Sequence, residues 1–115
     1  MTEHTTVPAG IWALTIATPI GRLPVTLTLT YEAGVLHGIA QSRGETVALQ
    51  DLAATAEPDG VRLTWRQSVT KPMRLNLHFD VLATADTITG FSTAGRLPRS
   101  AVTGIRDPGV PRRRA

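Results

Sequence analysis

The chain has 115 residues, 42% of them hydrophobic, and this length corresponds to one domain. It contains no cysteine, which excludes disulfides, thiolate metal ligands and cysteine nucleophiles. The net charge is +3, but Arg112, Arg113 and Arg114 account for all of this excess, so the rest of the chain is neutral. A neutral domain with few aromatic residues lacks the basic, aromatic-lined face of a nucleic-acid binder, and we expect no nucleic-acid partner.

The first residues have neither the basic start nor the apolar run of a secretory leader. No apolar run anywhere in the chain approaches the length of a transmembrane helix. The sequence therefore predicts a cytoplasmic protein with no membrane partner.

The chain is rich in threonine, with seventeen residues, and has a single lysine. Because threonine favours β-strands, this composition indicates a β-rich fold. Apolar and polar residues alternate along 23–31 and 73–81, which is typical of strands with one buried face. Turn-forming residues divide the rest of the chain at regular intervals. The predicted strands are 10–17, 23–31, 35–41, 46–53, 61–67, 73–82, 86–92 and 98–106. Because the segment 46–56 is rich in alanine, leucine and glutamine, a helix is the alternative there.

Short links between the strands predict that sequential neighbours pair as an antiparallel up-and-down meander. Closing about eight such strands removes the exposed edges and produces a small barrel. We therefore predict an all-β domain over residues 10–106, with a flexible N-terminus over 1–9 and a flexible basic tail over 107–115. A barrel of this size is either filled by its own side chains or holds one small ligand.

Gly10-Ile11-Trp12 on the first predicted strand, together with Arg106 near the end of the last, resembles the calycin pattern of lipocalins and avidin-like barrels. The resemblance implies that Trp12 and Arg106 pack together and close one end of the barrel. The polar biotin-binding set of the avidin-like proteins is missing here. By size and strand count alone, the chain also resembles the small barrels of the allene-oxide-cyclase type, some of which are natural-product cyclases.

The alternating strands predict an inward row of large side chains. Its candidate ligand-binding members are Leu27, Leu29, Tyr31, Trp65, Leu75, Leu77 and Phe79. A weak internal match at an offset of 52 residues aligns Gly38 with Gly90 and places both glycines on inward faces. Because two side chains are then missing inside, we expect a cavity that opens near Tyr31.

Few residues are candidates for chemistry. His78 and Asp80 fall on the outward face of their strand, which predicts a surface pair rather than a catalytic dyad. His37 lies on a strand with two partly apolar faces, so it points either outward or into the barrel, where it would act as a proton shuttle. Tyr31 at the barrel mouth is the other weak catalytic candidate. No phosphate loop, nucleophile elbow or metal-ligand spacing occurs, so we expect no metal and no cofactor.

Three functions fit this pattern. The leading hypothesis is a barrel that binds one small, largely apolar molecule. The first alternative is a cofactor-independent cyclase or isomerase that holds a reactive substrate in one shape, with Tyr31 or His37 donating a hydrogen bond. The second alternative is a structural module with a filled core whose threonine-rich outer face forms a homodimer.

Overall fold

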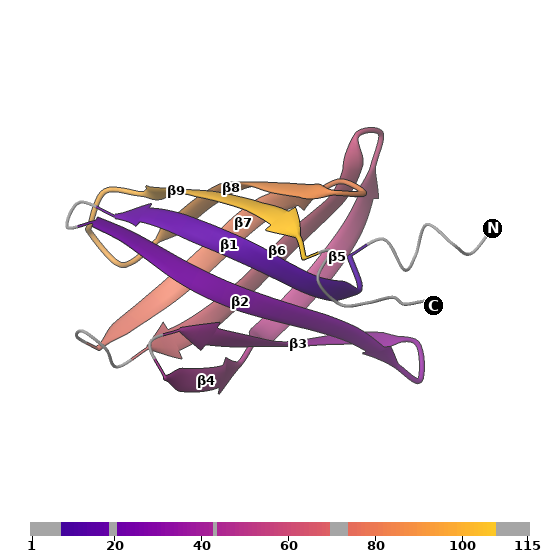
Figure 1. Cartoon of the computed structure of the whole chain (residues 1–115), viewed down its shortest axis with the longest axis horizontal. Helices are drawn as coiled ribbons and strands as arrows, with labels where there is room; N and C mark the ends of the chain where they lie inside the picture. The colour runs from indigo at the N-terminus through magenta and orange to yellow at the C-terminus, as the bar shows by residue number, and fades with distance from the viewer. Residues whose placement is uncertain (1–7, 19–20, 43, 70–73, 108–115) are drawn as a thin grey trace.

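The computed structural model describes residues 8–18, 21–42, 44–69 and 74–107. Within these ranges the chain forms nine antiparallel strands and no helix (Figure 1). The strands are β1 (Gly10–Thr18), β2 (Gly21–Glu32), β3 (Val35–Ser42), β4 (Glu45–Ala48), β5 (Gln50–Glu57), β6 (Gly60–Val69), β7 (Leu75–Ala83), β8 (Thr87–Thr93) and β9 (Ser100–Arg106). The predicted all-β class is confirmed, with nine strands in place of about eight. The described part of the chain contains no helix able to cross a membrane.

The nine strands form one sheet in the order β4-β3-β2-β1-β9-β8-β7-β6-β5. Strands β1 to β4 are one meander and β5 to β9 are a second, and the pairing of β1 with β9 joins the two. Figure 1 shows the resulting ring of obliquely crossing strands, a nearly closed barrel. Strands β4 and β5 are the two ends of the sheet, and a single residue, Leu49, connects them along the chain.

The predicted strand 46–53 is in fact two strands, β4 and β5. The Leu49 N–H donates to the Gly38 carbonyl at 3.0 Å, which extends the pairing with β3 by one hydrogen bond beyond β4. Asp51 then adopts a positive φ of 55°, and the register shifts between Gln50 and Ala53. Such a bulge bends the strand, and here it turns the chain from β3 toward β6. The helical alternative for 46–56 is wrong, because pairing with β3 and β6 outweighs the helix propensity of alanine and leucine.

Because the chain changes its pairing partner from β3 to β6, the sheet has a gap between β3 and β5, here called the seam. The Val35–His37 segment of β3 pairs with β2 alone, and β5 pairs with β6 alone, so no ladder joins β3 to β5 in the described residues. Tyr31 pairs with Leu36 beside the wide end of this seam. The barrel is therefore closed at β1–β9 and open between β3 and β5.

The inward rows follow the predicted parity. Leu27, Leu29, Leu77 and Phe79 are buried, and Leu75 is half-buried. The outward residues of the same two strands include Thr26 and His78, which are exposed, and Thr28, which is half-buried; Arg74, just before β7, is also exposed. The Trp65 and Phe79 rings stack at the centre with centroids 4.7 Å apart, and such a pair contributes about 0.5–1.5 kcal/mol beyond its burial.

One end of the barrel is closed by a contact between the first and last strands. The Arg106 guanidinium lies over the buried Trp12 ring, 4.3 Å from its centroid, as the resemblance to calycins implied. Arg106 also donates to the carbonyls of Ala9 at 2.6 Å and Ala85 at 2.8 Å. The Trp12 indole N–H donates to the Pro8 carbonyl at 2.9 Å. Four segments of the chain are thereby held together at this end.

A pair of alanine substitutions tests this closure. Gly10 and Gly21 have similar φ values of 128° and 132°, so an added side chain strains both backbones alike. A Cβ at Gly10 would lie 2.6 Å from Arg106 Nη1, whereas a Cβ at Gly21 would have no neighbour within 4 Å. We expect Gly10→Ala to lower the free energy of unfolding by about 1 kcal/mol more than Gly21→Ala, because the displaced guanidinium loses its stacking on Trp12. Urea unfolding measures both losses, and equal losses would contradict a role for Arg106 in closure.

Candidate functional site

The centre of the barrel is filled by its own side chains. Leu27 and Leu29 have no exposed surface, and Trp65 and Phe79 are 1% exposed. A side chain with no accessible surface borders neither solvent nor a void large enough for water. Of the seven inward residues expected to bind a ligand, these four form a packed core, and any open space begins beyond them.

The two inward glycines do not leave the expected cavity. A Cβ at Gly38 would lie 2.6 Å from Leu29 Cδ2 and 2.7 Å from Leu49 Cδ1, so leucine side chains already occupy this space. A Cβ at Gly90 would lie 2.3 Å from the Asp80 carbonyl oxygen, because the β7 backbone approaches closely. The prediction that these glycines create a cavity is therefore wrong, and both serve close packing instead.

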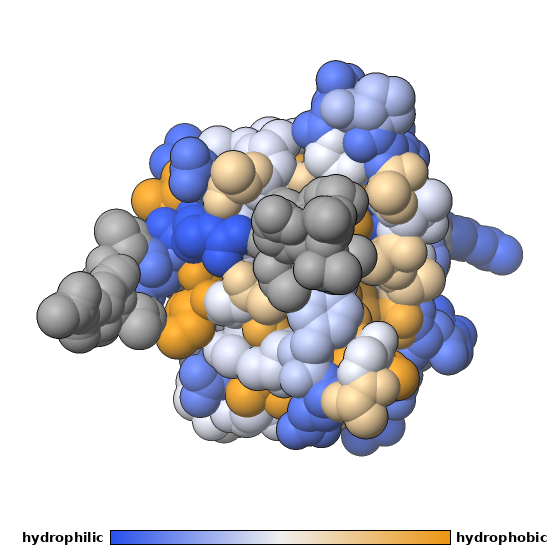
Figure 2. All heavy atoms as spheres, turned by 90° about the vertical axis from the view of Figure 1, so that its right-hand side faces the viewer, coloured by the Kyte–Doolittle hydropathy of each residue, from blue (hydrophilic) through white to orange (hydrophobic). Residues whose placement is uncertain are grey.

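A cleft of about 580 Å³ does open at the Tyr31 end. It lies at the wide end of the seam, between the end of β2, the β5–β6 hairpin and the turn after β7. Its lining residues are Tyr31, Ala54, Ala56, Glu57, Pro58, Asp59, Gly60, Val61, Thr84 and Ala85. Figure 2 faces this end of the barrel, where hydrophobic surface lies between hydrophilic projections at the periphery.

Two alanines make this cleft possible. Ala54 and Ala56 are the Cα partners of Leu63 and Val61, so they belong to the inward face of the barrel. Both are nevertheless exposed, because the seam leaves β5 uncovered on that side. The small inward side chains of Ala54 and Ala56 therefore leave the open space, which was predicted from the sequence to lie at Gly38 and Gly90.

The chemistry of the cleft is simple. Most of its wall is aliphatic, and the half-buried Tyr31 brings a phenol that both donates and accepts hydrogen bonds. Glu57 and Asp59 place carboxylates at the rim, and none of the lining residues is Lys, Arg or His. The cleft thus favours a neutral or cationic molecule over an anion.

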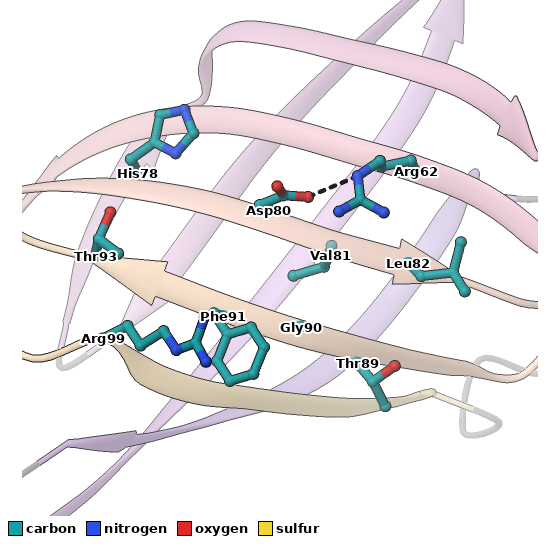
Figure 3. Close-up of a pocket in the computed structure, with 10 residues that line it drawn as sticks. All are labelled: Arg62, His78, Asp80, Val81, Leu82, Thr89, Gly90, Phe91, Thr93 and Arg99. Atoms are coloured by element: carbon teal, nitrogen blue, oxygen red, sulfur yellow. Dashed lines mark ion pairs between the residues drawn. The ribbon is translucent and has the colours of Figure 1, made fainter.

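A second hollow, of about 420 Å³, lies on the outer surface over β6, β7 and β8 (Figure 3). Arg62 Nε lies 3.0 Å from Asp80 Oδ1, an ion pair without the alignment of a hydrogen bond. Arg62 also contacts Glu57 at 3.8 Å, and the Arg99 guanidinium lies 4.1 Å over the Phe91 ring. Because its cations already face carboxylates or an aromatic ring, this hollow is better explained as surface pairing than as a ligand site.

The histidines lie outside the barrel. His37 is exposed and its Nε2 is 3.9 Å from Glu32 Oε1, so the inward orientation considered for it is wrong. His78 is exposed on the outer wall beside Asp80, as predicted, and lines the outer hollow. His4 lies outside the described residues. The described part of the chain holds no group of three potential metal ligands.

Comparison with known proteins gives a fold and no function. No protein-family model matches the chain, and no curated protein sequence matches it. A solved structure described as a redesigned β-barrel, b11L5F_LGL, is similar with a TM-score of 0.63 and 13% sequence identity, over 93% of this chain and 97% of that one. The likeness shows a β-barrel. At this identity it carries nothing about ligands, reactions or assembly.

Three polar residues that were not predicted as part of the core are buried among the described residues. Gln67 accepts a hydrogen bond from the Trp65 indole N–H at 2.9 Å, and Ser92 and Ser100 face each other across β8 and β9. Ser92 is also the Cα partner of Phe79, so small residues adjoin the stacked rings. Strand parity alone places all three inside, and this signal was available from the residues.

The glycine contacts lead to a paired prediction. The neighbours of an added Cβ at Gly38 are atoms of two leucine side chains, whereas the two nearest at Gly90 are backbone atoms of β7. We expect Gly90→Ala to cost about 1–3 kcal/mol as an overpacked site, and Gly38→Ala to cost clearly less. Chemical denaturation of the two variants checks this order. A larger loss for Gly38→Ala would contradict the close approach of β7 and β8.

Proposed function

We propose that this protein binds one small, largely apolar molecule in the cleft at the Tyr31 end of the barrel. The observation that carries the proposal is the position of Ala54 and Ala56, which are inward-facing yet exposed around a space of about 580 Å³. This volume falls within the range of small-molecule sites, about 300–1,000 Å³. The cleft, and not the filled centre of the barrel, is then the ligand site.

The lining suggests the class of ligand. Aliphatic walls favour burial of a hydrocarbon group, and the Tyr31 hydroxyl supplies one hydrogen-bonding group to orient it. The rim carries two carboxylates, that of Asp59 and that of Glu57, which contacts Arg62 at 3.8 Å, so it disfavours a carboxylate ligand and favours a neutral or amine head group. We infer that an aliphatic amine or alcohol binds more tightly than a fatty acid of the same length.

A cyclase or isomerase has less support. His37, one of its two proposed donors, lies outside the barrel, so of the two only Tyr31 lines the cleft. A cleft open to solvent also holds a reactive substrate less firmly than an enclosed chamber. Binding is therefore the function that the geometry favours.

Two substitutions on one strand test the site. Ala54 lines the cleft, and its neighbour Ala53 is exposed on the opposite face of β5. Trp at position 54 would fill the space, so we expect Ala54→Trp to weaken binding of Nile red, a neutral apolar dye, by at least about tenfold, or 1.4 kcal/mol. Ala53→Trp is the matched control and should bind as the parent protein does. Fluorescence titration measures the three affinities.

Two results would contradict the proposal. The parent protein would show no saturable uptake of Nile red, or the variants at 53 and 54 would bind it equally. Competition with decylamine and decanoate then tests the ligand class, and displacement of the dye by decanoate at the lower concentration would contradict the role of the rim carboxylates.

A further inference from the structure

The last described residues of the chain lie beside the proposed ligand cleft. The Arg106 side chain donates to the carbonyl of Ala85, which lines the cleft. The Asp107 backbone N–H donates to the Ile11 carbonyl at 2.8 Å, and Asp107 is the last residue that the structure describes. Residues 108–115, here called the C-terminal segment, are therefore attached at the mouth of the cleft.

The C-terminal segment and the cleft are complementary in charge. The segment has the sequence PGVPRRRA, with three arginines and no acidic side chain. The cleft rim carries the carboxylates of Glu57 and Asp59, and Asp86 is exposed in the turn after β7. Glu57 contacts Arg62 at 3.8 Å, whereas the ion pairs among the described residues include neither Asp59 nor Asp86. These two carboxylates are therefore available to cations from the C-terminal segment.

The C-terminal segment is also long enough to reach the rim. A Cβ at Gly60 would lie 2.3 Å from the Ala83 carbonyl oxygen, so the turn that carries Asp59 packs against the end of β7. The turn after β7 is the one that the last strand contacts. An extended chain advances about 3.3–3.6 Å per residue, so the five residues from Asp107 to Arg112 reach roughly 17 Å. Because a single turn separates Asp59 from the last strand, this reach is sufficient.

We propose that the C-terminal segment binds back across the cleft, with Val110 and Pro111 against the aliphatic wall and the arginines at the rim carboxylates. Ion pairs at a protein surface are individually weak. Attachment to the barrel compensates for this weakness, because a short tether holds the segment at an effective concentration on the order of millimolar.

The C-terminal segment then competes with a small apolar ligand for the same space. The apparent affinity of the cleft falls in proportion to the fraction of molecules in which the cleft is free. The segment thus regulates the affinity of the site. This competition rests on the proposed function, whereas the contact between the segment and the cleft does not.

Two variants of the full chain test the proposal. The serine variant removes the three positive charges of the segment and carries Arg112→Ser, Arg113→Ser and Arg114→Ser. The control variant removes three positive charges from exposed arginines at the opposite end of the barrel and carries Arg22→Ser, Arg74→Ser and Arg96→Ser. Circular dichroism confirms that each variant is folded.

A spin label detects the contact directly. Because the chain has no cysteine, Ala115→Cys gives one attachment point for a nitroxide label in the parent and in both variants. In the parent and the control variant, we expect the label to broaden the NMR amide signals of Ala54 and Asp59 much more than that of Gly21 at the far end of β2. The serine variant keeps the same tether and should lose most of the broadening at Ala54 and Asp59.

Nile red titration measures the competition. At low salt, the serine variant should bind the dye at least about threefold more tightly than the parent, because its cleft is free in more molecules. The control variant should bind it as the parent does. In 1 M NaCl the Debye length falls to about 3 Å, so the difference between the parent and the serine variant should disappear.

Different results overturn the contact and the competition. Equal broadening at Ala54 and Asp59 in the parent and the serine variant overturns the contact, as does an equal loss in the control variant. Broadening that falls on dilution also overturns it, because the segment would then bind a second copy. Equal dye affinities of the parent and the serine variant at low salt overturn the competition. If no protein takes up Nile red, the proposed function fails, and the broadening still decides whether the contact exists.

Discussion

Pairing between β1 and β9 is the constraint on which the rest of this fold depends. It joins two meanders whose strands otherwise pair with near neighbours in sequence, so it closes the longest loop in the chain and carries the largest loop-closure entropy. The Arg106 guanidinium offsets part of this cost by stacking on Trp12 and donating to Ala9 and Ala85. Gly10 leaves the room that this guanidinium occupies. Because β1 and β9 join the two meanders, the barrel does not need a ladder between β3 and β5 to hold them together.

The open side follows from the β4–β5 segment. The chain pairs with β3 only as β4 and with β6 only as β5, and it divides at Leu49 and the Asp51 bulge. The edges that remain on β3 and β5 are unpaired, and alanines on β5 leave them uncovered. The cleft thus lies at the side of the barrel where no ladder joins β3 to β5, next to the filled core.

Turn-forming residues divided most of the chain correctly into strands and indicated the all-β class, although 46–53 was predicted as one strand and is two. Alternation then indicated the buried faces, because a strand with one buried face has a period of two. It also placed His78 outside and Trp65 and Phe79 inside. Two features could not be predicted from the alternation of apolar and polar residues. The bulge at Asp51 depends on which strand the segment pairs with, and the space near Gly38 and Gly90 depends on how closely Leu49 and the β7 backbone approach these glycines. Contacts of this kind follow from the three-dimensional register and not from local pattern.

Native-state hydrogen exchange followed by NMR tests most directly the claim that the barrel is closed at β1–β9 and open at β3–β5. We expect the paired amides of β1 and β9 to exchange slowest. Amides of β5 that face away from β6, and those of Val35–His37 that face away from β2, should exchange fastest among the strands. Equal protection of the β3 and β5 edges and the β1–β9 ladder would contradict it, because the barrel would then be closed all round.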